Sequence, residues 1–281
     1  MKTLKLWLVA VTTALAVVAC QKEMSVDTTN GNDPKDSLIT GNGCQLTRWI
    51  EGTRGLPDDT IYVFKYDAQG RINKILDSGY DYATCLLKYN SAGRLSEMFM
   101  VELFHPADTF SVATYAYTNS GLLKSVKYAF RESEDIFHYG TDTLPTGMTH
   151  HYYDDFYNKH DSVQYKFSWN NGNMIKAERF DNSSSEVLFE ASYTNIPNQT
   201  KTLSLLELSN FIYFNTPYFS YFNKNMSKNI KYPSSVPGEE QVADYNYIPD
   251  TSGRVISYTE SWQRGGTPSG VRTINMTYGC K

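Results

Sequence analysis

The densest group of side chains suited to acid–base chemistry or metal binding lies in residues 150–161, where histidines alternate with tyrosines and aspartates. If this segment is a strand, adjacent side chains point to opposite faces, so His150 and His151 cannot ligate one ion together. A metal site would need a further ligand from elsewhere, such as His138 or His160. The spacing matches no known metal-binding motif. We therefore favour a polar loop and strand within an insertion, and assign no metal ligand.

Motifs for covalent or phosphoryl-transfer catalysis are absent from the sequence. It contains no Gly-x-Ser-x-Gly, His-Glu-x-x-His, phosphate-loop or Gly-x-Gly-x-x-Gly pattern. We therefore assign no catalytic residue and no cofactor, and favour a non-enzymatic protein. Two carboxylates distant in sequence could still meet in the fold and hydrolyse a glycosidic bond. A glycan-active hydrolase is therefore kept as an alternative.

The first twenty residues have the features of a bacterial lipoprotein signal peptide. Lys2 and Lys5 precede an apolar run of roughly 15 residues, which is too short to cross a bilayer as a helix. The run ends in Val-Val-Ala-Cys at 17–20, which resembles a lipobox. We predict removal of residues 1–19 and lipidation of Cys20, which changes the formal net charge from −4 to −6. The alternative is an ordinary secretory signal in which this cysteine is incidental.

The residues after the lipobox predict how the chain is held. Two or more acyl chains bind a protein firmly to a membrane, so no spanning segment is needed. Gln-Lys-Glu at 21–23 resembles the short acidic export signals of Bacteroidota surface lipoproteins. Residues 20–43 are rich in Ser, Thr, Asn, Asp and Gly, which predicts a flexible tether before a single folded domain at 44–281. We expect an outer-membrane protein that is lipid-anchored and faces the exterior.

The three remaining cysteines are expected to meet oxidising conditions after export. Cys44 opens the first expected strand and Cys280 closes the last, so an antiparallel meeting of these strands would place them together as a disulfide. Cys85 occupies an apolar position of the repeat described next, which predicts a buried thiol. Because spacing does not define connectivity, three unpaired buried cysteines are the alternative.

An internal repeat predicts the elements that position these residues. The segment 62–72, Tyr-Val-Phe-Lys-Tyr-Asp-Ala-Gln-Gly-Arg-Ile, is echoed at 85–95, and further copies occupy 113–123, 165–174 and 245–255. Aromatic or aliphatic residues alternate before a turn that Asp, Asn or Thr opens and Gly completes. An aliphatic residue then begins a returning strand. Each copy therefore predicts one β-hairpin.

Hairpins in series predict an all-β fold. A long antiparallel meander twists, and beyond about 10 strands it curls, splits or closes. We therefore expect an open or closed barrel-like sheet. Apolar residues at helical spacing predict one short helix within 200–214. Proline and glycine in residues 215–244 predict an ordered insertion over an opening of the sheet.

The turns of the repeat carry a family resemblance. Tyr-Asp-x-x-Gly-Arg at 66–71 and Tyr-Asn-x-x-Gly-Arg at 89–94 are similar to YD or Rhs-type repeats. With the lipobox, Asn-Gly-Asn-Met-Ile-Lys at 171–176 and Tyr-Thr-Asn-Ile-Pro-Asn at 193–198, they make the chain resemble uncharacterised Bacteroidota lipoproteins with a porin-like β domain. The resemblance implies location and β architecture, and no activity or functional residue. Lysines in the hairpins, such as Lys65, favour a sheet that faces water rather than lipid.

Composition limits the partners. The chain has 22 Tyr, 14 Phe and 4 Trp at a formal net charge of −4, so it lacks the basic excess of a nucleic-acid binder. Exposed aromatic rings could stack on sugars, with Trp49, Trp169 and Trp262 as first candidates. We predict a non-enzymatic β scaffold that binds a glycan or protein partner, through residues the sequence does not identify. A structural component of the envelope is a further alternative, beside the hydrolase.

Overall fold

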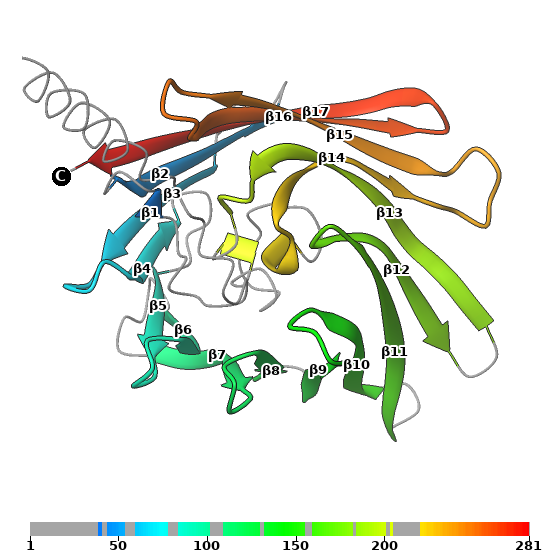
Figure 1. The fold of residues 1–281 in the computed structure, drawn as a ribbon, viewed down its shortest axis with the longest axis horizontal. Coiled ribbons are helices and arrows are strands. Elements are labelled where there is room, and N and C mark those ends of the chain that lie inside the picture. The colour runs from blue at the N-terminus through cyan, green and yellow to red at the C-terminus, as the bar shows by residue number, and fades with distance from the viewer. Residues whose placement is uncertain are drawn as a thin grey trace, which may run out of the picture. The chain divides into compact units, whose positions relative to one another are not determined.

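A computed structural model provides the structure of the protein (Figure 1). It describes residues 39–40, 44–53, 60–77, 84–101, 109–129, 132–154, 159–181, 184–200, 203–204 and 220–280. The signal peptide, Cys20 and nearly all of the tether therefore lie outside the described residues. Within the described ranges the chain is almost entirely β-strand.

The strands follow one another with turns and loops between them, and a single turn of 3-10 helix, η2 (Ser220–Phe222), precedes β14. In chain order the strands are β1 (Ile39–Thr40), β2 (Cys44–Thr53), β3 (Thr60–Tyr66), β4 (Ile72–Asp77), β5 (Thr84–Tyr89), β6 (Leu95–Val101), β7 (Thr109–Tyr117), β8 (Leu123–Tyr128), β9 (Ser133–Tyr139), β10 (Pro145–Asp154), β11 (Lys159–Asn170), β12 (Asn173–Asp181), β13 (Ser184–Pro197), β14 (Asn225–Tyr232), β15 (Gln241–Pro249), β16 (Val255–Arg264) and β17 (Thr267–Cys280). No helix among the described residues is long and apolar enough to cross a membrane.

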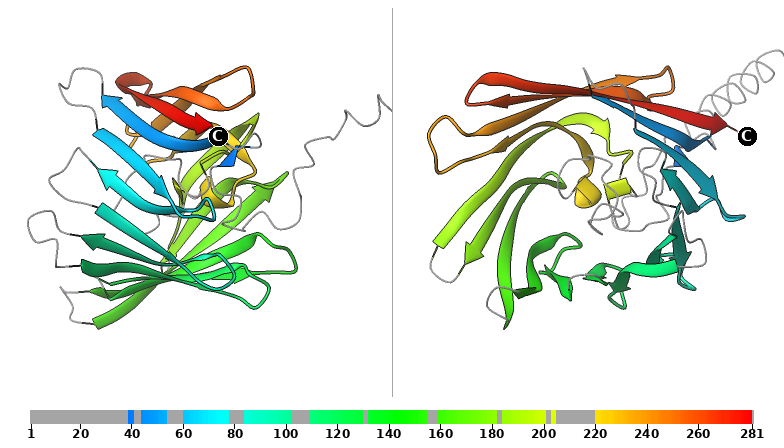
Figure 2. Two further views of the ribbon diagram at one scale, coloured as in Figure 1. Left: turned by 90° about the vertical axis from the view of Figure 1, so that its left-hand side faces the viewer. Right: turned by 180° about the vertical axis from the view of Figure 1, so that it is seen from behind.

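Sixteen strands, β2 to β17, close a barrel (Figures 1 and 2). Each pairs antiparallel with the next strand in the sequence, and β17 returns to pair with β2. The short β1 pairs with the start of β2. The prediction of an all-β antiparallel meander curled into a barrel-like sheet is confirmed, and the barrel is closed. Closure satisfies the backbone groups that an open sheet would leave at its two edges.

The prediction of an insertion at 215–244 is wrong. Residues 225–232 form β14, and β15 begins at Gln241, so both are wall strands. The proline and glycine residues between them mark a hairpin loop, in which Gly238 has a φ of 79° that favours glycine. Of the helix expected within 200–214, the structure describes Leu203 and Ser204 in helical conformation. The other residues of that prediction lie outside the described part of the chain.

Most of the apolar side chains of the wall point into the barrel, together with the buried acids described below. Trp49, Ile72, Met98 and Leu123 are fully buried on this inner face. Burying a side chain of this size contributes about 1.5–3 kcal/mol relative to its exposure. The outward positions include exposed lysines, namely Lys65, Lys88, Lys124 and Lys127. The wall therefore has an apolar inner face and a polar outer face.

A short described segment that precedes β14 lies inside the barrel. Figure 1 shows η2 inside the ring of strands, and Tyr221 and Phe222 are buried there. The Phe222 ring lies 5.1 Å, centroid to centroid, from Phe137 on β9, a strand on another side of the barrel. We call the interior of the barrel the lumen. Its core is thus completed by residues that belong to no strand.

The two ends of the barrel differ. One end, which we call the turn end, carries the tight turns of the repeats after β3, β5, β7 and β15, together with the start of β2 and the end of β17. The other, which we call the hairpin end, carries the loops between repeats. The strands β11, β13 and β17, which begin at this end, contain 12, 14 and 14 residues, whereas β3 to β6 contain 6 or 7 residues each. Long hairpins therefore project from one end (Figure 1).

Candidate functional site

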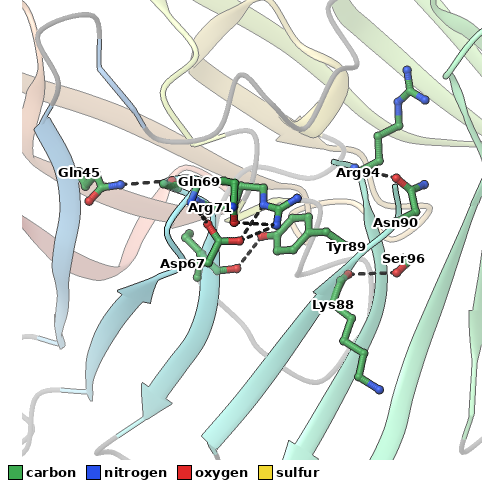
Figure 3. A network of polar contacts seen from close by, with 11 residues as sticks. Gln45, Asp67, Gln69, Arg71, Lys88, Tyr89, Asn90, Arg94 and Ser96 are labelled. Atoms are coloured by element: carbon green, nitrogen blue, oxygen red, sulfur yellow. Dashed lines mark hydrogen bonds and ion pairs between the residues drawn. The ribbon is translucent and has the colours of Figure 1, made fainter. Parts of the chain in front are cut away.

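The Tyr-Asp-x-x-Gly-Arg repeat forms a compact turn (Figure 3). Asp67 Oδ1 accepts hydrogen bonds from the backbone N–H groups of Gln69 and Arg71, each at 2.9 Å, and Oδ2 accepts one from Arg71 Nε at 2.8 Å. Gly70 has a φ of 78°, a conformation that costs other residues about 1–2 kcal/mol. The same bonds recur at Asp250, so the repeat encodes its turn through the aspartate side chain.

The aromatic residue before each turn bonds across to the neighbouring hairpin. The β4–β5 ladder ends at Lys74 and Leu86, and the Tyr89 hydroxyl then donates to the Ile72 carbonyl beyond it. A side chain thus continues the hydrogen bonding where the backbone strands separate. Seven such bonds of 2.5–2.9 Å run from Tyr66 to Leu46, Tyr89 to Ile72, Tyr117 to Leu95, Tyr139 to Leu123, Trp169 to Pro145, Tyr193 to Met174 and Tyr278 to Val255.

We call these seven residues and Tyr247 the bridging aromatics, one on each odd-numbered strand from β3 to β17. The arginine of a turn lies over the bridging aromatic of a neighbouring hairpin. The Arg71 guanidinium lies 4.4 Å from the Tyr89 ring centroid, and Arg254 lies 5.6 Å from that of Tyr278. The first repeat, at 62–72, therefore contacts the preceding strand β2 through Tyr66 and the following hairpin through Arg71.

Tyr247 is the bridging aromatic without a bond. By the pattern of the other seven, its hydroxyl would donate to the Ser227 carbonyl, because the β14–β15 ladder ends at Asn229 and Asp244. Instead the Tyr247 hydroxyl and the Ser227 Oγ are both buried without a hydrogen-bond partner. The β13–β14 register is irregular here, between Ser192 and Tyr193 and again before Pro197. The bridge fails where the chain leaves the wall to enter the lumen.

Buried acids lie on the lumen side of the wall. Glu260 on β16 is 2% exposed, accepts a hydrogen bond from the Tyr245 hydroxyl at 2.9 Å, and lies 3.6 Å from Arg272 Nη1. Burial raises the pKa of Glu260 above its usual value of 4.5. Glu51 on β2 accepts a hydrogen bond from Trp49 Nε1 at 3.1 Å. These acids are therefore held by neighbouring side chains.

A second polar group lies on β8, β9 and β10. Asp135 Oδ1 lies 2.6 Å from His150 Nδ1, and Oδ2 accepts a hydrogen bond from the Tyr128 hydroxyl. Asp135 is buried, whereas the His150 side chain is 29% exposed. The His150 ring stacks on Tyr152, with centroids 5.5 Å apart and planes at 17°. An oriented imidazole next to an aromatic ring is thus presented to the lumen.

The structure separates the residues of the histidine-rich segment. Residues 150–154 belong to β10 and residues 159–161 to β11, so a strand is present as predicted. The placement of this segment in an insertion is wrong, because both are wall strands. His150 faces inward, and His151 is exposed on the outer face. His138 and His160 are also exposed. No group of three or more metal-binding side chains occurs among the described residues.

The tryptophans do not form an exposed sugar-binding surface. Trp49 is fully buried, so its suggested role in stacking on a ligand is wrong. Trp169 replaces a tyrosine as a bridging aromatic and donates to the Pro145 carbonyl at 2.7 Å. Trp262 stacks on Tyr232 with centroids 5.8 Å apart. The sequence analysis did not predict the hydrogen bonds of the bridging aromatics, although their fixed place before each turn was the available signal.

Two cysteines join the strands that close the barrel, and a third is buried in the wall. Cys44 and Cys280 form a disulfide with an S–S distance of 2.03 Å, between the first residue of β2 and the last of β17. Cys85 is a free, buried thiol, and burial raises its pKa to about 12. The disulfide joins the two strands whose pairing closes the ring, while Cys85 has the environment of an unreactive core residue.

Comparison with known proteins identifies the fold. No protein-family model matches the chain, and no curated protein matches it in sequence. It is similar to the crystal structure of a porin-like protein from Bacteroides uniformis, with a TM-score of 0.54 and 14% identity over 83% of this chain and 98% of that chain. The chain has a porin-like β fold. A porin-like protein from Bacteroides vulgatus gives a TM-score of 0.45 and 13% identity over 83% and 98% of the two chains.

Proposed function

We propose that this protein is a lipid-anchored β-barrel of the outer membrane, facing the exterior, whose hairpin end binds a glycan or protein partner. The observation that carries the proposal is the difference between the two ends of the barrel. β2 begins at Cys44 at the turn end, so the tether that leads back to Cys20 leaves from that end. The long hairpins lie at the opposite end. An anchor on Cys20 would therefore present the hairpin end away from the membrane.

The outer face of the wall favours a barrel that lies outside the lipid bilayer. A membrane-spanning barrel needs an apolar outer band, and a lysine at its midplane costs about 2–4 kcal/mol. Lys65, Lys88, Lys124 and Lys127 are exposed on the outside of β3, β5 and β8.

The environments of the buried acids favour binding over hydrolysis. A glycan hydrolase needs one carboxyl group as acid and a second that faces it. Each buried acid here is bonded to a side chain of its own part of the wall: Glu51 to Trp49, Glu260 to Tyr245, and Asp135 to Tyr128 and His150. These bonds suit acids that stabilise the wall. The hydrolase and the structural envelope component remain the alternatives to a binding scaffold.

Two measurements on cells test the proposal. Metabolic labelling with radioactive palmitate should mark the wild-type protein and not Cys20→Ser, which should leave the membrane fraction. A membrane-impermeant maleimide should then label Ser269→Cys, at the exposed tip of the β16–β17 hairpin, on intact cells. Ala68→Cys, exposed in a repeat turn, reports the turn end.

Retention of Cys20→Ser in the membrane would contradict the lipid anchor. Labelling of Ser269→Cys only after the cells are permeabilised would contradict the exterior location. Equally rapid labelling of both reporters is compatible with a long tether, whereas labelling of Ala68→Cys alone would reverse the proposed orientation.

A further inference from the structure

One lumen-facing group has no role in the turns, the bridges or the closure of the barrel. It comprises His150 and Tyr152 on β10, Tyr165 on β11 and Arg179 on β12. Tyr165 and Arg179 are direct cross-strand partners. All four side chains are partly exposed, although they lie on the inner face of the wall. We call this set the β10–β12 patch.

The inward direction of the patch follows from strand alternation. His150 and Tyr152 lie two and four residues after Met148, which is buried in the core. Tyr165 lies between Val163 and Phe167 at the same spacing, and both of these are buried. The patch lies at the hairpin half of the lumen, where β10 and β11 continue toward their loop. It is therefore the part of the lumen nearest to the end that we propose faces away from the membrane.

The hydrogen bonds of Asp135 determine what His150 offers to a ligand. Tyr128 donates to one carboxylate oxygen, and His150 Nδ1 lies 2.6 Å from the other. The Asp135 carboxylate accepts both of these bonds, so His150 Nδ1 carries a hydrogen and donates it. Nε2 then remains for a hydrogen bond to a ligand hydroxyl group, which can either donate or accept. Tyr152, stacked on this ring, fixes its orientation from the side.

The chemistry of the patch matches a ring that bears hydroxyl groups. Nε2 of His150 and the hydroxyl of Tyr165 can each form a hydrogen bond with a hydroxyl group of a ligand. The partly exposed Tyr152 ring adds an apolar face on which the C–H groups of a pyranose can lie. The carboxylate of Asp135 is buried behind the histidine and takes no part in contact. These features favour a ligand that is recognised through its hydroxyl groups.

We propose that the β10–β12 patch is a binding site for a neutral saccharide, with His150 as the hydrogen-bond partner of a sugar hydroxyl group and Tyr152 as the stacking surface. The proposal rests on the partner-binding role proposed above and assigns that role a site and a ligand class. The proposed saccharide site lies inside the barrel near the hairpin end, and not on the outer face of the wall.

The test uses the purified full chain and four neutral tetrasaccharides as probes: those of β-1,4-glucose, α-1,4-glucose, β-1,4-xylose and β-1,4-N-acetylglucosamine. Titration calorimetry should detect binding of at least one. Loss of one neutral hydrogen bond weakens binding about tenfold. We therefore expect His150→Ala and Tyr152→Leu each to raise the Kd of that probe about tenfold or more.

Matched controls come from the outer face of the same strand. His151→Ala and Tyr153→Leu change the same residue types one position along β10, on the opposite side of the wall. These two variants should leave the Kd within about twofold of wild type, since they lie outside the lumen. Urea midpoints of all four variants show which remain folded.

A measurement on the unaltered protein covers the case in which His150→Ala fails to fold. In long-range ¹H–¹⁵N spectra of the histidine-labelled chain, addition of the bound saccharide should shift the Nε2 signal of His150 and leave that of His151 in place. Failure of all four probes to bind at 10 mM overturns the proposal, as does binding that the controls weaken and the patch variants do not. Neither outcome affects lipidation or orientation on cells, which the labelling experiments report separately.

Discussion

The bridging aromatics make a quantitative prediction about stability. Tyr89→Phe keeps the ring and removes the hydroxyl that donates to the Ile72 carbonyl at 2.5 Å. A neutral hydrogen bond contributes about 0.5–1.5 kcal/mol, and a carbonyl left without its partner adds to the loss. We therefore expect Tyr89→Phe and Tyr117→Phe each to lower the free energy of unfolding by about 1–2 kcal/mol.

Tyr247→Phe provides the matched control, because the Tyr247 hydroxyl is buried with no hydrogen-bond partner. Removal of a buried, unpaired polar group costs nothing and can stabilise the fold by about 1 kcal/mol. We expect its free energy of unfolding to equal or exceed that of the wild type. The contrast between Tyr89 and Tyr247 therefore isolates the hydrogen bond from the loss of a hydroxyl as such.

The assay is urea unfolding followed by tryptophan fluorescence, with the Cys44–Cys280 disulfide intact in every variant. Trp49 is fully buried in the core and so reports exposure of the interior. Shifts in the midpoint at a constant slope measure changes in stability. The reasoning would be refuted by a Tyr247→Phe variant as unstable as Tyr89→Phe, or by the absence of any loss in Tyr89→Phe and Tyr117→Phe.

Four further predictions concern other features of the fold. Replacement of both Cys44 and Cys280 by serine should lower the free energy of unfolding by about 2–5 kcal/mol, measured against the oxidised wild type, because the disulfide closes a loop of 236 residues. Glu260 has a pKa raised by burial, so its contribution to stability is greatest below its usual pKa of 4.5 and is lost as the pH rises through the folded value. The urea midpoint of Glu260→Gln, relative to that of the wild type, should accordingly increase from pH 4 to pH 6 and pH 8. A difference between the two midpoints that does not change with pH would contradict this. Cys85 should resist iodoacetamide at pH 8 in the native protein and react once it is unfolded, since its pKa is about 12; mass spectrometry detects the adduct. Gly70→Ala should lose about 1–2 kcal/mol because Gly70 has a φ of 78°, whereas Gly270→Ala, where an added Cβ meets nothing within 4 Å, should remain close to wild type in the same urea assay.

Local sequence predicted the hairpins because their turns are determined by neighbouring residues. Asp67 bonds to Gln69 and Arg71 within its own turn, so Tyr-Asp-x-x-Gly-Arg could be recognised without knowledge of the rest of the chain. The positions of Cys44 and Cys280 at the outer ends of the first and last strands of the repeat domain likewise pointed to an antiparallel meeting of those strands.

Features that depend on the register between hairpins could not be predicted. The partner of Tyr89 is Ile72, which is set by how β4 and β5 align and not by the repeat itself. His150 and Asp135 meet within the β9–β10 hairpin, but this hairpin carries no recognised copy of the repeat, so its register could not be predicted either. Residues 215–244 misled because proline and glycine mark both hairpin loops and insertions.

Seven of the eight bridging aromatics bond to the preceding strand in the same way, and this has a consequence for how such proteins diversify. We expect that a whole hairpin can be duplicated or deleted, because the new neighbours meet through the same aromatic contact. An odd number of added strands would send the last strand in the wrong direction and place Cys280 at the opposite end from Cys44. The circumference of a barrel built from this repeat can therefore grow or shrink only by two strands at a time.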